Sequence, residues 1–267
     1  MDQSQRRERD NDPAPAASEF SLTVSRALGI LSMFSPSRPQ LSLVEISRES
    51  KLSKPSVLRF MQALLIHGYV EQDPNTKKYR PGYETFRVGS LVGGYGLRTT
   101  ALPIMRAITE KLGFTTYLSI LRSDKMLVLL SVEGKGPLRY TVPVGEVLPL
   151  TSTSAGQAAL SVFDDAEIAD ILKDSKFERQ TRVAPGSMSE LLERVRQVRM
   201  HGYALSWEMT SPGVGSVASP AIGGDDTLVA VLSLGFGTGQ VDRTQVGELG
   251  RNIAQAAEDL SAVLRNS

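Results

Sequence analysis

Apolar positions recur with a helical period three times near the amino-terminal end of this chain, each time between polar stretches. The run SLTVSRALGILSMF, residues 21–34, predicts a helix that ends at the proline-containing segment SPSRPQ. The run LSLVEISRES, residues 41–50, predicts a short second helix with Ser42 as its N-cap. Ser53 precedes a third helical pattern with a proline in its first turn, where a missing N–H costs nothing.

A short polar hairpin follows the third helix. Gly68 is well suited to end that helix. YVEQ and KKYR predict two strands, and DPNT between them places Asp, Pro and Asn in favourable β-turn positions. The order of helix, short helix, turn, helix and hairpin is that of a winged helix-turn-helix, which we assign to residues 20–82.

The rest of the chain alternates between apolar runs and amphipathic ones. Residues 83–98, which contain a cluster of glycines, predict a linker helix, and residues 99–267 predict a second domain. Its strands are predicted in FTTYLSIL, KMLVLLSV, LRYTVPV, GYALSWE, GSVASPAI and TLVAVLSLGF. Helical patterns such as MSELLERVRQVRMHG are interspersed with them, so we expect an α+β chain whose second domain is mixed α/β around an antiparallel or mixed sheet.

The amino-terminal residues and the composition restrict the class of protein. Residues 1–19 are polar and mixed in charge, and they predict a disordered tail rather than a signal peptide. No apolar run approaches the roughly 18–20 residues of a membrane-spanning helix, so we expect no membrane partner. The chain has no cysteine, which excludes disulfides and thiolate chemistry and fits the cytoplasm, where we expect the protein.

Motifs that would indicate an enzyme or a metal site are weak. His67 and His201 each precede a glycine at a predicted helix end, where a cation suits the helix dipole. GFGTGQ matches only part of a dinucleotide-binding fingerprint, and GVGSVA lacks the closing glycine of a nucleophile elbow. Metal sites need several His, Cys or carboxylate ligands together, and the sequence shows no such cluster. We therefore expect no enzyme, no cofactor and no metal.

Charge is distributed unevenly along the chain. The whole sequence has a formal net charge of +1, but residues 36–82 contain eight Lys or Arg against four Asp or Glu, a local net charge of +4. The remainder is therefore net −3. This asymmetry indicates a polyanionic partner for the amino-terminal domain alone.

The positions of these cations favour double-stranded DNA as that partner. The first turns of a recognition helix face the major groove, where Arg reads guanine and Ser reaches bases or phosphate. A wing contacts the adjacent backbone or minor groove. Each exposed charge alone is ordinary, whereas the set on this motif is specific. The predicted DNA-binding residues are Lys54, Ser56, Arg59, Lys77, Lys78 and Arg80.

Several segments resemble one family of regulators. SLTVSRALGILSMF, LVEISRESKLSKPSVLRFMQALLIHGYVEQD and KKYRPG are similar to the DNA-binding domain of the IclR family of bacterial transcriptional regulators. VGEVLPLTSTSAGQAALS and HGYALSWEMTSPGVGSVASPA resemble that family's effector-binding domain. The resemblance implies a GAF-like second domain that binds a small organic or aromatic acid, and a homodimer or homotetramer on palindromic operators.

The resemblance also implies which residues contact the effector. It assigns Leu148 as an apolar wall, Ser154 and Ala155 as backbone donors at a helix start, and Ser216 and Ser233 as further contacts. Backbone N–H groups at a helix start have no intrahelical partners, which suits a carboxylate.

Two departures from the family pattern suggest a different ligand. Family members that bind very small oxo-acids carry an acidic residue where this chain has Ser206 and a second hydroxyl where it has Gly235. Trp207, the only tryptophan, falls in the same stretch, and we include it and Ser206 among the predicted effector contacts. Fewer polar anchors and more space favour a larger or more apolar ligand, and an aromatic acid is our hypothesis.

The sequence therefore predicts a DNA-binding transcriptional regulator controlled by a small-molecule effector. Two alternatives remain at this point: the second domain only oligomerises, or the chain is an enzyme with a basic accessory domain. A change of operator affinity with a small molecule separates the first alternative from the prediction, and turnover of a substrate without DNA identifies the second.

Overall fold

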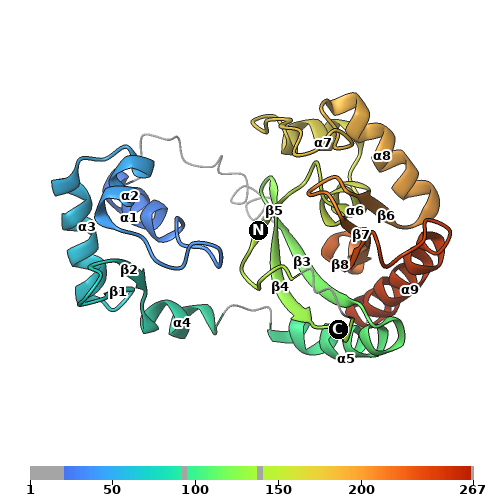
Figure 1. Ribbon diagram of the computed structural model, residues 1–267, viewed down its shortest axis with the longest axis horizontal. Coiled ribbons are helices and arrows are strands. Elements are labelled where there is room, and N and C mark those ends of the chain that lie inside the picture. Colours follow the sequence, from blue (N-terminus) through green and yellow to red (C-terminus); the bar gives the residue numbers. More distant parts are fainter. Residues whose placement is uncertain (1–20, 92–94, 137–140, 266–267) are drawn as a thin grey trace, which may run out of the picture. The chain divides into compact units, whose positions relative to one another are not determined.

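The computed structural model describes residues 21–91, 95–136 and 141–265 (Figure 1). The predicted tail, residues 1–19, lies outside the described residues. The chain divides into two compact units, Met1–Leu91 and Val92–Ser267. We call them the amino-terminal unit and the carboxy-terminal unit.

The amino-terminal unit has the element order expected of a winged helix-turn-helix. Its elements are α1 (Leu22–Leu31), α2 (Leu43–Ser50), α3 (Lys54–Ile66), β1 (Val70–Gln72), β2 (Tyr79–Pro81) and α4 (Tyr83–Gly89). Ser42 and Glu45 form a capping box at the start of α2, and the side chain of Ser53 caps α3. These local signals explain why both helix starts were predictable from the sequence.

A single small core holds the helices to the wing. Strands β1 and β2 pair antiparallel, and backbone hydrogen bonds in both directions join Leu41 to Tyr79 on β2. Gly68 follows α3 with a φ of +73°, a left-handed conformation that favours glycine and turns the chain into β1. The fully buried side chains come from all three helices and both strands: Ile30, Leu41, Ile46, Val57, Met61, Val70 and Tyr79.

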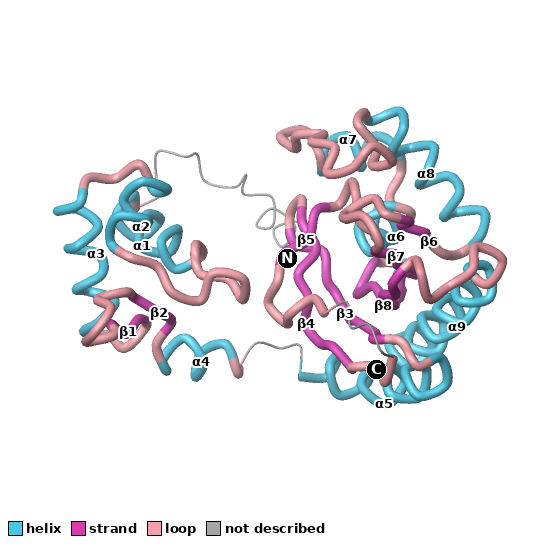
Figure 2. The backbone as a smooth tube through the Cα atoms, in the orientation of Figure 1, coloured by secondary structure: helices cyan, strands magenta, loops and turns pink. Residues whose placement is uncertain are grey.

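The carboxy-terminal unit is built on one six-stranded antiparallel sheet (Figure 2). Its strand order is β5-β4-β3-β8-β7-β6, so the first and last long strands, β3 and β8, lie together in the middle. The strands are β3 (Thr115–Arg122), β4 (Lys125–Val132), β5 (Val147–Pro149), β6 (Ala204–Trp207), β7 (Val214–Ile222) and β8 (Leu228–Gly237), with a 3-10 turn at Gly224–Asp226.

Helices cover both faces of this sheet and create two cores (Figure 1). On one face, α5 (Tyr95–Leu112) and α9 (Val246–Arg265) pack against the sheet around Leu118 and Phe236. On the other face lie α6 (Ser154–Leu160), α7 (Asp165–Ile171) and α8 (Met188–His201), packed around Leu160 and Val231. The predicted α+β class, with a helix-turn-helix followed by a mixed α/β unit, is confirmed.

Two details differ from the predicted elements. The run LRYTVPV was predicted as a strand, but its described residues, 141–144, form none. Pro143 lacks an N–H, and Gly145 has a φ of +88°, so the backbone turns here and strand β5 begins only at Val147. In the region predicted as a linker helix, α4 ends at Gly89 and α5 begins at Tyr95, with residues 92–94 outside the described residues.

Candidate nucleic-acid interface and effector pocket

Helix α3 exposes two of the predicted cations at its amino-terminal half. Val57 and Met61 are buried, so the rotation of the helix leaves Lys54 and Arg59 exposed on its outer surface. Neither cation forms an ion pair with another described residue. Ser56 differs, because its Oγ lies 2.9 Å from the Oγ of the capping Ser53 and is only half-exposed.

The two lysines of the wing follow a turn that the carboxylate of Asp73 stabilises. Asp73 accepts hydrogen bonds from the backbone N–H groups of Thr76 (2.7 Å) and Asn75 (2.9 Å), which lower the pKa of its carboxyl. Lys77 and Lys78 follow, both exposed. The turn therefore fixes the backbone from which the two lysines project.

Arg38 and Arg80, two further cations of this unit, form ion pairs with glutamates. Arg38 donates to both carboxylate oxygens of Glu49, at 2.8 and 2.7 Å, and these hydrogen bonds lower the pKa of Glu49. Arg80, one of the predicted contacts, donates through Nε and Nη2 to one oxygen of Glu71, at 3.0 and 2.8 Å. Apart from Arg26 on α1, the described cations of this unit that form no ion pair with another described residue lie on α3, the turn before it and the wing tip: Lys51, Lys54, Arg59, Lys77 and Lys78.

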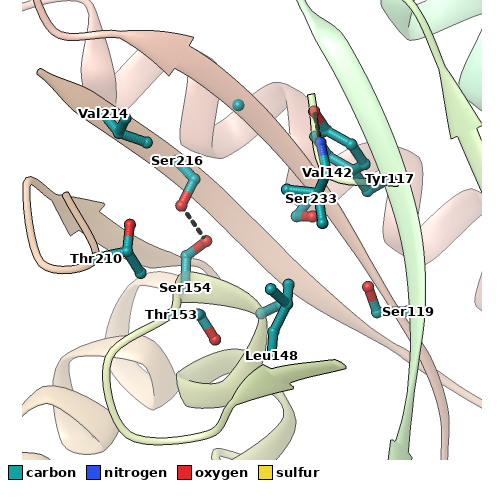
Figure 3. A pocket seen from close by; sticks show the side chains of 12 residues that line it. Tyr117, Ser119, Val142, Leu148, Thr153, Ser154, Thr210, Val214, Ser216 and Ser233 are labelled. Carbon is teal, nitrogen blue, oxygen red and sulfur yellow. Dashed lines mark hydrogen bonds between the residues drawn. The ribbon is translucent and has the colours of Figure 1, made fainter. Parts of the chain in front are cut away.

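A cavity of about 40 Å³ lies between the sheet and α6 in the carboxy-terminal unit (Figure 3). None of the described residues that line it carries a formal charge. Hydroxyl-bearing side chains contribute from several strands and loops, and apolar ones fill the spaces between them. The lining consists of Tyr117, Ser119, Thr153, Ser154, Thr210, Ser216 and Ser233 with Val142, Leu148, Ala155, Val214 and Gly235.

Five of the seven predicted effector residues line this cavity: Leu148, Ser154, Ala155, Ser216 and Ser233. The hydroxyl oxygens of Ser154 on α6 and Ser216 on β7 lie 2.7 Å apart, which ties the helix start to the sheet (Figure 3). All five residues are brought together because α6 packs directly on β7 and β8.

The start of α6 is fixed by its cap and by close packing. Thr153 accepts a hydrogen bond from the N–H of Gly156 (3.0 Å) and donates to the carbonyl of Pro149 (2.7 Å). A Cβ atom at Gly156 would lie 2.3 Å from the Cα of Leu150, so only glycine fits there. These contacts hold the helix start against the loop that follows β5.

Ser206 and Trp207 lie outside the lining of the cavity. Ser206 is buried, and its hydroxyl donates to the carbonyl of Ser152 at 3.4 Å. Trp207 packs on the opposite face of the sheet, with its ring centroid 5.9 Å from that of Phe236 and the Arg243 guanidinium 4.7 Å above it. Successive residues of a strand point to opposite faces, so these two neighbours on β6 cannot share one cavity.

The sequence reasoning missed several lining residues. Tyr117 and Ser119 both come from β3, and the hydroxyl oxygen of Tyr117 accepts a hydrogen bond from the N–H of Val142 at 3.3 Å. Thr210 comes from the turn between β6 and β7. One signal was present in FTTYLSIL, since polar side chains at alternate positions of a buried strand indicate a polar surface inside the molecule.

The fold and these two sites define a winged helix-turn-helix protein that binds DNA and carries a second domain with an internal pocket. A model of the IclR helix-turn-helix domain matches residues 23–74, and a model described as bacterial transcriptional regulator IclR C-terminal matches residues 90–262. The chain therefore belongs to the IclR family of bacterial transcriptional regulators.

Individual relatives agree with this assignment. The HTH-type transcriptional regulator XynR of Escherichia coli is 30% identical over 91% of this chain and 96% of its own length. The crystal structure of an IclR family regulator from Brucella abortus, 25% identical, superposes with a TM-score of 0.78 over 92% of this chain and 94% of that one. An IclR homolog from Microbacterium hydrocarbonoxydans, crystallised with 4-hydroxybenzoate, is 19% identical with a TM-score of 0.76, over 92% of this chain and 100% of that one.

These relatives bear on the alternatives that the sequence left open. The chain is a DNA-binding transcriptional regulator, and its relatives are named as regulators rather than as enzymes. No helix within the described ranges combines the length and the apolar character needed to cross a membrane.

Proposed function

We propose that this regulator changes its affinity for operator DNA when a small organic acid enters the cavity between the sheet and α6. The cavity carries this proposal, because it joins buried hydroxyls with apolar walls, the usual composition of a small-molecule site. A ligand that contacts both α6 and the sheet stabilises one arrangement of them over another, and such differential binding shifts a conformational equilibrium.

The size of the cavity bears on the class of acid. At about 40 Å³ it is far smaller than the ~150 Å³ of an engineered cavity that binds benzene, so it best fits a short aliphatic acid. An aromatic acid is the second candidate, supported by the 4-hydroxybenzoate in the Microbacterium homolog. An aromatic ring would require the cavity to widen, for example by movement of the 208–213 turn that carries Thr210.

For DNA we propose separate roles for the helix and the wing. Arg59 enters the major groove and reads a base, while Lys54, Lys77 and Lys78 contact phosphates. Ser56 and Arg80 join the interface after exchanging their bonds to Ser53 and Glu71 for bonds to DNA. Since the DNA partner is chromosomal, we place the protein in the cytoplasm.

We further propose that the regulator binds DNA as a homodimer or homotetramer. Large apolar side chains lie exposed on α1 and α4 and support self-association: Leu22 is 66% exposed, Leu28 57%, Tyr83 82% and Phe86 77%. Two copies then present two α3 helices to the two halves of a palindromic operator. Sedimentation velocity at micromolar concentration should show a dimer or tetramer, and a monomer would contradict this part.

The test of the proposed function is a ligand screen on a real operator. Repeated selection from a random-sequence duplex pool by the full-length chain yields a binding site, which is then labelled for fluorescence anisotropy. Aliphatic and aromatic acids are titrated into the complex. We expect at least one acid to change operator affinity by fivefold or more, the order of a typical allosteric coupling. If no acid alters affinity, the second domain only oligomerises.

A further inference from the structure

One buried hydroxyl in the cavity has no hydrogen-bond partner. Ser119 lies in the middle of β3, is 1% exposed, and its Oγ contacts no donor or acceptor among the described residues. The residue belongs to the cavity lining (Figure 3). Burying a hydroxyl without a partner is unfavourable, so nearly all buried polar side chains are paired. The fully buried, unpaired hydroxyl of Ser119 therefore requires an explanation.

Four of the surrounding hydroxyls, those of Tyr117, Thr153, Ser154 and Ser216, are already bonded within the protein. Ser154 and Ser216 bond each other, Thr153 bonds the backbone on both sides, and Tyr117 accepts from the N–H of Val142. These bonds shape the wall of the cavity. Ser119 is directed to the same face of the sheet as Tyr117, two residues away on β3, and its bonding capacity is unused.

The register of the sheet places a second hydroxyl beside Ser119. Ser119 pairs with Val231 on β8, and Tyr117 pairs with Ser233, so Ser233 is the diagonal neighbour of Ser119 on the cavity face. Ser233 is also buried, and it lines the same cavity. Valines flank Ser119 on both adjacent strands, Val128 on β4 and Val231 on β8, so neither neighbour offers it a side-chain partner.

We propose that Ser119 reads a hydroxyl group of the effector, so that the ligand is a hydroxy-substituted acid rather than the corresponding unsubstituted acid. This inference rests on the proposed function and specifies the ligand class of the same cavity. A ligand hydroxyl both donates and accepts, as the Ser119 hydroxyl does, so one group satisfies it in either orientation. An unsubstituted ligand leaves Ser119 without a partner and binds more weakly.

The chain contains a matched control for this residue. Ser131 on β4 also has a buried hydroxyl without a partner, but it is not part of the cavity lining. Ser119→Ala and Ser131→Ala therefore remove the same group from the same sheet. Only the first removes it from the cavity.

The experiment measures binding of matched acid pairs to the full-length chain by isothermal titration calorimetry. The pairs are glycolate and acetate, 3-hydroxybutyrate and butyrate, and 4-hydroxybenzoate and benzoate. In the wild-type protein we expect the hydroxylated member of at least one pair to bind roughly tenfold more tightly, as one buried neutral hydrogen bond provides. Ser119→Ala should remove that preference without weakening the unsubstituted acid, and Ser131→Ala should preserve it.

Thermal unfolding of the ligand-free variants gives a second readout that needs no ligand. Because the Ser119 hydroxyl is unpaired, the Tm of Ser119→Ala should equal or exceed that of the wild type. A clear fall in Tm would show that the hydroxyl has a structural partner, such as an ordered water, and would overturn the inference. Equal binding within every pair would also overturn it while leaving the proposed function intact. Failure of every acid to bind would overturn both.

Discussion

The two units of this regulator hold the side chains proposed to bind their ligands in opposite environments. The amino-terminal unit holds cations on the surface of α3 and the wing, without ion pairs to other described residues, while Arg38 and Arg80 bond its glutamates. The carboxy-terminal unit places neutral hydroxyls around a cavity, and the fully buried hydroxyl of Ser119 there has no hydrogen-bond partner among the described residues. Exposed cations attract a long polyanion such as DNA at the protein surface, whereas buried polar groups select a small ligand inside the protein.

The strongest expected effect of a single substitution falls on the wall of the cavity. Gly156→Ala places a methyl group 2.3 Å from the backbone of Leu150, which cannot move without displacing the loop before α6. We expect the free energy of unfolding to fall by about 3 kcal/mol, as measured by urea denaturation. Gly29→Ala, which meets no atom within 4 Å on α1, is the control and should be neutral or stabilising. A stable Gly156→Ala variant would show that the cavity wall is not close-packed.

The next effect concerns a cation of the exposed surface. Arg59→Ala should weaken operator binding by about 1–3 kcal/mol, the usual cost of losing a base contact, and relax specificity at one base position. Anisotropy titrations on the selected duplex measure both changes. Arg80→Ala should cost less, because Arg80 is already engaged with Glu71. An equal or larger effect of Arg80→Ala would show that the ion pairs do not decide which cations meet DNA.

A smaller effect distinguishes the bonded hydroxyls of the cavity from the unbonded one. Ser216→Ala leaves the buried Ser154 hydroxyl without its partner at 2.7 Å, so the free energy of unfolding should fall by about 1 kcal/mol. Ser119→Ala removes a hydroxyl that has no partner and should not destabilise the protein. Chemical denaturation of the two variants side by side checks this difference, and the account is wrong if their stabilities change equally.

The smallest expected effect is a pH dependence in the amino-terminal unit. The hydrogen bonds from Arg38 hold the pKa of Glu49 below its usual value, so the pair favours the folded state above the unfolded-state pKa of ~4.3. This contribution is lost as the pH falls through the lower, folded-state pKa. Glu49→Gln should therefore make the fall of Tm between about pH 6 and about pH 3 less steep than in the wild type. The control variant is Glu178→Gln, whose carboxylate has no partner among the described residues.

Local chemistry made the amino-terminal unit predictable. Residues close together in the sequence form the caps at Ser42 and Ser53 and the apolar face of α3. These short patterns specify both where the helices begin and which side of α3 is buried. The described part of the predicted strand LRYTVPV, residues 141–144, forms no strand because Pro143 lacks an N–H and the left-handed Gly145 follows directly after the run.

The cavity was predictable only where family resemblance supplied positions. Ser154 and Ser216 are 62 residues apart, and nothing local in the sequence indicates that their oxygens meet. Ser119 was also missed because its position on the cavity face depends on how β3 pairs with β8. The two strands are far apart in the sequence, so no local pattern indicates this pairing. Trp207 was assigned to the ligand although its position on β6 turns it to the opposite face.

The central claim, that exposed cations of the amino-terminal unit bind DNA, is tested most directly by the salt dependence of duplex affinity. The full-length chain is compared with the triple variant Lys54→Gln, Lys77→Gln, Lys78→Gln. A control, Lys173→Gln, Arg179→Gln, Arg196→Gln, removes three ion-paired cations from the carboxy-terminal unit. The slope of log affinity against log salt should become shallower by about 0.9 per phosphate contact, or about 2.7, in the first variant alone. An unchanged slope in that variant, or an equal loss in the control, would contradict the account.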